Sequence, residues 1–245
     1  MDQGLLYVVA TPIGNLEDIT LRALHVLKEV DAIVAEDTRH TQKLLQHYNI
    51  VKPLLSFFEP KEEEKLPGIL ESLKGGKNLA LVTDAGTPTV SDPGFRLVRA
   101  CVEAGIPVVP IPGASAALCA LVASGLPTDR FFFAGYLPEK PGKRKKTMED
   151  LKKLPHTLIL YLSKWKASKQ TEELAQILGD RRACLARELT KLHEEFWRGT
   201  LPELAKRLRQ QKLRGEMTLV VEGVKSQVDK NFRYRRGYFK ENLST

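Results

Sequence analysis

The chain of 245 residues has 28% charged residues and a formal net charge of +8 at pH 7. Its apolar runs are too short to cross a membrane, its amino terminus lacks the basic region of a signal peptide, and its three cysteines form no CxxC pair. These features exclude a membrane span, a disulfide scaffold and a zinc ribbon, so we expect a soluble cytoplasmic protein with room for two domains. The basic balance suits a polyanionic partner such as RNA, although many basic proteins bind no nucleic acid.

The first half of the chain alternates strand and helix patterns. Short apolar, β-branched runs predict strands, and apolar residues recurring every three or four positions predict helices. We expect strands at 5–10, 32–35, 54–57, 79–83 and 108–111. Helices are expected from Asp18, as the N-cap, to Val30, then through Leu44, Leu45 and Tyr48 after the polar segment 36–40, at 66–73 and at 95–104. This alternation predicts an α/β fold with a parallel sheet covered on both faces.

The second half has a different pattern. A helix is expected after 112–116 and up to Ser124, followed by strands at 131–133, 157–162, 183–189 and 218–221 and helices at 169–178 and 202–210. The basic segment 139–153, which contains proline and glycine, is predicted to be a connector. We expect an N-terminal α/β domain over 1–112, a C-terminal α/β domain over 113–224 and a basic, aromatic tail over 225–245.

Two loops carry the clearest functional signal. The loops 11–15 (TPIGN) and 84–94 (DAGTPTVSDPG) each follow a predicted buried strand and precede a helix. Ligands of α/β proteins bind at the carboxyl ends of parallel strands, where helix amino termini and free backbone N–H groups converge. Gly14, Gly86 and Gly94 leave the backbone open to a ligand there. Each loop alone could be an ordinary strand-to-helix turn, but the pair favours a site.

Several common chemistries lack their motif. The sequence has no GxGxxG after a strand, no GxxxxGK[ST], no HExxH and no GxSxG. We therefore expect no catalytic metal and no nucleophile of the hydrolase kind. The remaining glycine-rich strand ends suit a reaction whose group donor arrives already activated.

A series of motifs occurs in a fixed order along residues 5–223: 11–15, 35–39 (AEDTR), 84–88 with 91–94, 112–116 (PGASA), 126–130 (LPTDR), 187–191 (RELTK) and 215–217 (GEM). Together they resemble the ribosomal RNA small subunit methyltransferase I family of the tetrapyrrole methylase superfamily. The resemblance implies two α/β domains, with a mostly parallel N-terminal sheet, a mixed C-terminal sheet and a cleft between them that binds S-adenosylmethionine. It also implies 2′-O-methylation of a cytidine in the decoding region of small-subunit rRNA, free or in the 30S subunit, by a homodimer.

The resemblance also implies which residues contact the methyl donor. It places the cleft wall in the first loop and a donor-binding segment in the second, with further contacts at the start of the 116–124 helix and in the C-terminal domain. Asp84 is either a ligand of the donor's ammonium group or a residue that holds its loop. The full set is Pro12, Ile13, Gly14, Asp84, Gly86, Thr87, Val90, Ser115, Ala116, Leu162, Leu189, Met217 and Thr218.

Candidate catalytic and RNA-binding residues are charged. Asp37 and Arg39 are expected to shape the acceptor site, with Glu188 as a further catalytic candidate, although such acids are often structural ion-pair partners. Cations interleaved with aromatic residues can contact phosphates and unpaired bases, and the alternative is a solvated surface. The candidates are Lys140, Lys143, Arg144, Lys145 and Lys146, together with Arg233, Arg235 and Arg236 in the tail.

Two stretches depart from the family pattern. The chain has Ser56–Pro60 where relatives often have a His-rich stretch, and Leu162–Lys166 (LSKWK) where they commonly read ESPHR. Two other functions therefore remain open on the sequence. One is methylation of a tetrapyrrole or corrinoid, and the other is RNA binding by a relative that has lost catalysis.

Overall fold

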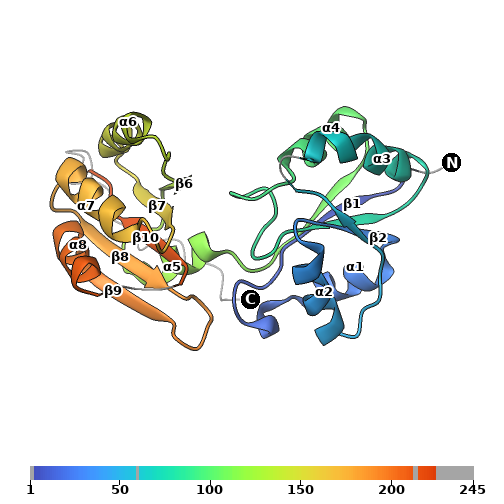
Figure 1. The fold of residues 1–245 in the computed structure, drawn as a ribbon, viewed down its shortest axis with the longest axis horizontal. Coiled ribbons are helices and arrows are strands. Elements are labelled where there is room, and N and C mark those ends of the chain that lie inside the picture. The colour runs from blue at the N-terminus through green and yellow to red at the C-terminus, as the bar shows by residue number, and fades with distance from the viewer. Residues whose placement is uncertain (1–2, 59–60, 212–214, 225–245) are drawn as a thin grey trace, which may run out of the picture.

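The computed structural model describes residues 3–58, 61–211 and 215–224. In this part of the chain two five-stranded sheets lie beside each other, each with its own helices (Figure 1). Within the same residues, no helix combines the length and the apolar character needed to cross a membrane. The predicted tail, 225–245, lies outside the described residues. The predicted boundary at residue 112 falls between β5, which ends at Ile111, and α5, which begins at Ala116.

The first sheet is parallel throughout. It consists of β1 (Leu6–Val9), β2 (Ala32–Ala35), β3 (Leu54–Ser56), β4 (Leu79–Val82) and β5 (Val108–Ile111) in the order β3-β2-β4-β1-β5. Every residue of β2 and β4 is buried, as expected for strands covered on both faces. Because β1 and β4 are parallel neighbours, their carboxyl ends lie at the same edge of the sheet, and the two glycine-rich loops that follow them lie side by side.

Four helices cover the first sheet. Helices α1 (Leu21–Glu29) and α2 (Thr38–His47) pack on one face, and α3 (Glu62–Lys74) and α4 (Phe95–Glu103) on the other. The predicted N-cap of α1 is wrong. Asp18 belongs to a short 3₁₀ turn, η1 (Leu16–Asp18), and the hydroxyl of Thr20 caps α1 by accepting a hydrogen bond from Ala23 N at 3.1 Å.

The second sheet is mixed. It consists of β6 (Phe131–Tyr136), β7 (Thr157–Leu162), β8 (Arg182–Arg187), β9 (Glu195–Thr200) and β10 (Met217–Val221) in the order β6-β7-β10-β8-β9, and only the β6–β7 pair is parallel. The predicted strand 183–189 ends early, because Glu188 and Thr190 have φ values of 50° and 66°. A parallel sheet and a mixed sheet confirm the predicted α/β class.

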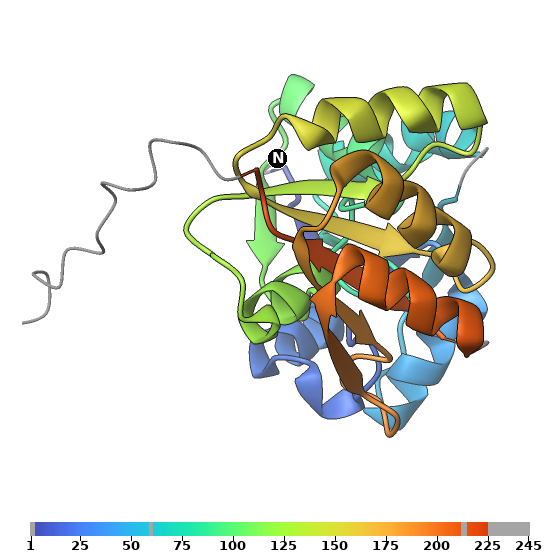
Figure 2. The ribbon, with the colours of Figure 1, turned by 90° about the vertical axis from the view of Figure 1, so that its left-hand side faces the viewer.

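Helices α6 (Pro141–Lys152), α7 (Ala167–Leu178) and α8 (Leu201–Gln210) cover one face of this sheet, as Figure 2 shows. The prediction of a connector at 139–153 is therefore wrong. Apolar residues are sparse in this lysine-rich segment, yet Arg144, Met148 and Leu151 recur on one helical face and are buried. Pro141 occupies the first helical turn, where proline is tolerated.

The opposite face of the second sheet turns toward the first half of the chain. Helix α5 (Ala116–Ser124) packs there against Ile159, Cys184 and Val220. Ile13, from the loop after β1, belongs to the same apolar cluster. The loops at the edge of the first sheet thus lie against the second sheet, and a pocket forms between them.

Candidate active site

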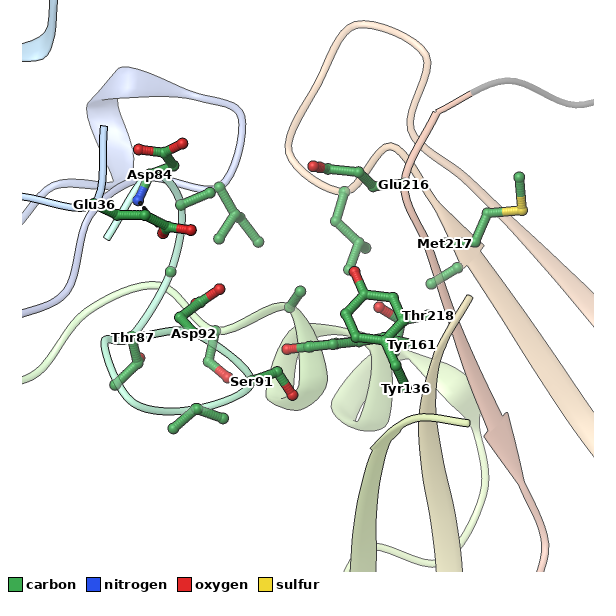
Figure 3. A pocket seen from close by; sticks show the side chains of 18 residues that line it. Glu36, Asp84, Thr87, Ser91, Asp92, Tyr136, Tyr161, Glu216, Met217 and Thr218 are labelled. Carbon is green, nitrogen blue, oxygen red and sulfur yellow. Dashed lines mark hydrogen bonds between the residues drawn. The ribbon is translucent and has the colours of Figure 1, made fainter. Parts of the chain in front are cut away.

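A pocket of about 210 Å³ lies between the two halves of the chain (Figure 3). The loops of the first sheet contribute one wall, the strands β6, β7, β8 and β10 the other, and the start of α5 the floor between them. The lining residues are Ile13, Glu36, Asp84, Ala85, Gly86, Thr87, Val90, Ser91, Asp92, Ser115, Ala116, Tyr136, Tyr161, Ala186, Leu189, Glu216, Met217 and Thr218.

Hydrogen bonds hold the two glycine-rich loops together. The N–H of Thr11 donates to the carbonyl of Gly86 at 2.8 Å, and the N–H of Gly86 donates back to Thr11 at 3.0 Å. The hydroxyl of Thr11 also donates to the carbonyl of Thr83 at 3.0 Å, and that of Thr87 to the carbonyl of Ala114 at 3.3 Å. Gly86 has a φ of 88°, which favours glycine. The wall of the pocket is therefore preformed.

Three carboxylates line the first wall. Glu36 accepts a 2.7 Å hydrogen bond from the hydroxyl of Thr83, and Asp84 accepts one of 3.2 Å from the N–H of Asp37. Burial and the nearby Glu36 raise the pKa of Asp84. Burial, and then Glu36, raise the pKa of Asp92 to about 6. A bound cation would relieve this crowding of negative charge, so the wall suits a positively charged ligand.

The second wall is mainly apolar and aromatic, with Glu216 and Thr218 as further polar residues. Tyr136 and Tyr161 are register partners on β6 and β7, with ring centroids 5.5 Å apart, and burial raises the pKa of Tyr161 to about 12. In Figure 3 both rings face Asp92 across the cavity. Ala186 and Leu189 continue this wall. The pocket therefore offers an apolar, aromatic surface opposite a cluster of carboxylates.

The structure brings most of the predicted donor contacts into this pocket. They are Ile13, Asp84, Gly86, Thr87, Val90, Ser115, Ala116, Leu189, Met217 and Thr218. The Met217 side chain points away from the cavity in Figure 3 and lies in the core beneath the helices, so its main chain forms the lining.

Three predicted donor contacts lie elsewhere. Pro12 lines a neighbouring hollow. Gly14 faces residues 189–191, where an added Cβ would lie 2.5 Å from Lys191 Cγ and 2.9 Å from the carbonyl of Leu189. Leu162 is 1% exposed and packs in the core on the helix-covered face of its sheet, so the prediction that it contacts adenosine is corrected. Alternation along β7 explains this, because its neighbour Tyr161 is the residue that faces the pocket.

The three catalytic candidates do not line the pocket and have structural partners. Asp37 caps α2 by accepting from Arg39 N at 2.8 Å, and its carboxylate pairs with the Arg39 guanidinium through contacts of 3.1 and 2.8 Å. Hydrogen bonds from Arg39 hold the pKa of Asp37 far below its usual range, which makes it a poor proton acceptor.

Glu188 supports the loop before β10. It accepts hydrogen bonds from Glu216 N at 2.9 Å and from the Lys191 ammonium at 3.2 Å. Burial raises the pKa of Glu188, but these two hydrogen bonds and the positive charges of Lys191 and Arg187 together outweigh it and leave the pKa lowered. Neither the Asp37–Arg39 pair nor Glu188 is therefore placed to accept a proton inside the pocket.

The pocket also contains residues that sequence reasoning did not select as site residues. Glu36, Ser91 and Asp92 lie in motifs from which neighbouring residues were selected, so the motifs could have indicated these three positions as well. Tyr136 and Tyr161 carry no motif, and their meeting depends on the parallel pairing of β6 with β7. The others are Glu216, which precedes β10, and the two alanines Ala85 and Ala186.

The lysine-rich candidates for RNA contact separate into two groups. Lys140, Lys143, Lys145 and Lys146 are exposed. Arg144 is buried, pairs with Glu173 and donates to the carbonyls of Pro138 and Glu139, so the expectation that it contacts RNA is corrected. The tail candidates, Arg233, Arg235 and Arg236, lie outside the described residues. In the described part of the chain, no cluster of three or more His, Cys, Asp or Glu residues could hold a metal ion.

Comparison with known proteins identifies the family. Residues 5–205 match the family of tetrapyrrole (corrin/porphyrin) methylases. The ribosomal RNA small subunit methyltransferase I of Bacillus subtilis is 50% identical over 222 residues, which cover 91% of this chain and 76% of that protein. The protein of the same name from Haemophilus influenzae is 50% identical over 223 residues, covering 90% and 79%.

Solved structures share the fold at lower identity. A cobalt precorrin-4 methyltransferase superposes with a TM-score of 0.67 at 20% identity, covering 89% of this chain and 94% of that one. A uroporphyrin-III C-methyltransferase from Thermus thermophilus, complexed with S-adenosyl homocysteine, has a TM-score of 0.61 at 21% identity, covering 89% and 97%. The fold, the family match and the sequence identity together show that this chain belongs to the tetrapyrrole methylases and, within them, to the ribosomal RNA small subunit methyltransferase I family.

Proposed function

We propose that this protein transfers the methyl group of S-adenosylmethionine to the 2′-oxygen of a cytidine ribose in the decoding region of small-subunit rRNA. The observation that carries the proposal is the pocket itself, in which carboxylates face an apolar, aromatic wall. The methyl donor has a sulfonium and an ammonium at one end and an adenosine at the other, so its two ends match the two walls. Relatives named for rRNA methylation at 48–50% identity support the choice of acceptor.

Different residues of the pocket contact different parts of the methyl donor. Glu36, Asp84 and Asp92 face its cationic end, and Leu189 and Ala186, with the main chain of β10, face adenosine. Ser115 is the N-cap of α5 and caps no N–H with its side chain, so N–H groups of the first turn remain for the donor's carboxylate.

When bound, the donor supplies a methyl group on a positively charged sulfur, which is a good leaving group. The protein then has to hold the ribose oxygen close to that methyl group, which can contribute about 7–11 kcal/mol. A C–O bond forms as the S–C bond breaks, its electron pair stays on sulfur, and the hydroxyl proton passes to a carboxylate or to water. Asp92, with a pKa of about 6, is ionised at neutral pH and can hold that proton better than Asp37 can.

The proposal is tested by methyl transfer from labelled S-adenosylmethionine to small ribosomal subunits that lack the modification, followed by mapping of the labelled nucleotide. Label on a ribose 2′-oxygen in the decoding region is expected. Label on a base would contradict the ribose assignment. Donor binding without transfer to subunits or naked rRNA would favour a tetrapyrrole acceptor. RNA binding without donor binding would favour a relative that has lost catalysis.

Three further expectations belong to the same proposal. The partner is small-subunit rRNA or the 30S subunit, the location is the bacterial cytoplasm where ribosomes assemble, and the active form is a homodimer. Light scattering on the purified protein tests the last of these directly. A mass of one chain, about 27.5 kDa, would reject the dimer.

A further inference from the structure

A second hollow, of about 230 Å³, opens beside the pocket and shares Asp84 with it. It lies between the loop after β1 and helix α2, and we refer to it as the α2 hollow. Pro12, Leu16 and Leu44 give it an apolar side, while His40 and Lys43 of α2 give it a polar one. Because Asp84 lines both cavities, a molecule lying in the α2 hollow would reach the pocket at that residue.

The walls of the α2 hollow are held in place. The hydroxyl of Tyr48, which follows α2, donates to the carbonyl of Leu16 at 2.6 Å and so fixes the loop against the helix. The buried hydrogen bond from Thr11 to Thr83 joins the two strand ends behind it. Leu44 of α2 is buried, with only 8% of its surface exposed. The hollow is therefore a feature of the folded chain rather than a gap between loose side chains.

The charges of the two cavities differ. Carboxylates line the pocket, and they would repel a phosphate group placed there. His40 and Lys43 are three residues apart on α2, so their side chains are neighbours, and both are exposed. His40 is close enough to Asp84 to lower the pKa of that carboxyl, against the effects of burial and Glu36.

Two neighbouring cations, Lys191 and Arg39, are already paired. Lys191 contacts Glu188 at 3.2 Å and Glu216 at 2.8 Å, and Arg39 is held by Asp37. Lys43 forms no salt bridge with any residue that the structure describes. A phosphate next to the reacting ribose would therefore find its available cation in the α2 hollow.

We propose that the α2 hollow binds the acceptor nucleotide of the RNA, with a backbone phosphate at Lys43 and His40 and the ribose reaching the donor pocket at Asp84. The apolar side, at Pro12, Leu16 and Leu44, would then contact the base or the sugar. This inference rests on the proposed function and adds the place where the acceptor lies. Phosphate contacts of this kind fix the register of a nucleic acid on a protein rather than its sequence preference.

The test compares Lys43→Gln with Lys28→Gln, an exposed lysine of α1 that does not line the α2 hollow. The binding of small ribosomal subunits is measured at several salt concentrations, and donor binding is measured by calorimetry. We expect Lys43→Gln to weaken subunit binding severalfold and to reduce the slope of log affinity against log salt by about 0.7–0.9, the value for one lost phosphate contact. Donor affinity should stay unchanged in both variants. His40→Gln combined with Lys43→Gln should weaken subunit binding further.

Two outcomes would overturn the inference, and they are distinguishable. If the two single variants bind subunits equally and with the same salt slope, while the unaltered protein transfers methyl groups, the acceptor does not lie in the α2 hollow. If the unaltered protein neither binds nor methylates subunits, the proposed function fails and the α2 hollow loses its ligand with it. Since both lysines are exposed, a folding defect does not complicate either comparison.

Discussion

Arg144 and Glu173 join helix α6 to helix α7 through a two-point ion pair. Arg144 Nε lies 2.7 Å from Glu173 Oε2, and Nη2 lies 3.0 Å from Oε1. The Arg144 side chain is 8% exposed, and its remaining donor reaches the carbonyl of Glu139 at 2.6 Å. The guanidinium therefore ties together the start of α6, the segment before it and the neighbouring helix.

Replacing Arg144 by alanine should lower the thermal midpoint by several degrees, because a buried guanidinium that satisfies a carboxylate and two carbonyls is lost. The matched change Lys145→Ala, at an exposed neighbour, should leave the midpoint nearly unchanged. The hydrogen bond from Arg144 lowers the pKa of Glu173. The ion pair therefore stabilises the folded protein fully at pH values above 4.5, the ordinary pKa of a glutamate, and this stabilisation is lost as the pH falls below that value. Equal midpoints for both variants at pH 7 would contradict this role.

Gly14 lies where the first loop contacts the second half of the chain. A Cβ there would lie 2.7 Å from Thr190 Oγ1, and the next residue, Asn15, donates its N–H to the same oxygen at 3.0 Å. Gly14→Ala should displace residues 189–191, including the pocket residue Leu189, and weaken donor binding by about 1–2 kcal/mol. Calorimetric titration with S-adenosylmethionine measures this.

Gly68→Ala is the matched control for Gly14→Ala. Gly68 lies in α3 and is exposed, and a Cβ added there would meet no neighbouring atom within 4 Å. Alanine there should stabilise the protein by up to about 1 kcal/mol and leave donor affinity unchanged. If Gly14→Ala binds the donor as tightly as Gly68→Ala does, the contact at Gly14 does not shape the pocket.

The sequence predicts the fold best where burial is complete. Strand β2 reads Ala-Ile-Val-Ala and β4 reads Leu-Ala-Leu-Val, and both are buried at every position. Strand β9 escaped prediction because Trp197 is its only deeply buried residue and charged residues interrupt the apolar pattern. Helix α6 escaped because its core-facing positions include an arginine, whose burial depends on a partner that lies 29 residues further along the chain.

The loops of the site can be predicted from their sequence motifs. The residues that strand pairing brings into the site cannot. The loops around Gly14 and Gly86 can be predicted because glycine and proline directly follow apolar runs that are typical of strands. Tyr136 and Tyr161 meet only because β6 pairs in parallel with β7, which no local pattern encodes. Asp37 is a catalytic candidate in the sequence because it follows a predicted strand, but its roles as the cap of α2 and as the partner of Arg39 are visible only in the structure.

Leu162 and Thr218 lie on opposite faces of adjacent strands and should respond differently to substitution. Leu162 is buried beneath the helices, so Leu162→Ala should cost about 2–5 kcal/mol of unfolding free energy and leave donor affinity unchanged where the protein remains folded. Thr218 lines the pocket, so Thr218→Val should keep stability within about 1 kcal/mol and weaken donor binding. Denaturant unfolding and calorimetry separate the two effects. Weaker donor binding by folded Leu162→Ala would restore that residue to the site.

Asp92 couples the stability of the protein to its donor binding. Its pKa is raised from 3.8 to about 6, mainly by burial and then by Glu36. The folded state therefore disfavours the ionised carboxylate. The resulting loss of unfolding free energy grows as the pH rises from about 4 to about 6 and reaches its full value above that. Asp92→Asn should raise the unfolding free energy by about 1–3 kcal/mol at pH 8 and have little effect on it at pH 4.

The same substitution should weaken donor binding at pH 8, because a carboxylate facing the sulfonium and ammonium is lost. In the unaltered protein donor affinity should increase as the pH rises through 6, since Asp92 ionises there and binding of a cation favours the ionised form. In Asp92→Asn this increase should be absent. Asp18→Asn, at an exposed position outside the pocket, is the control and should follow the unaltered protein in both measurements. A pH dependence that survives in Asp92→Asn would assign it to Glu36 or Asp84 instead and would remove Asp92 from the cationic end of the site.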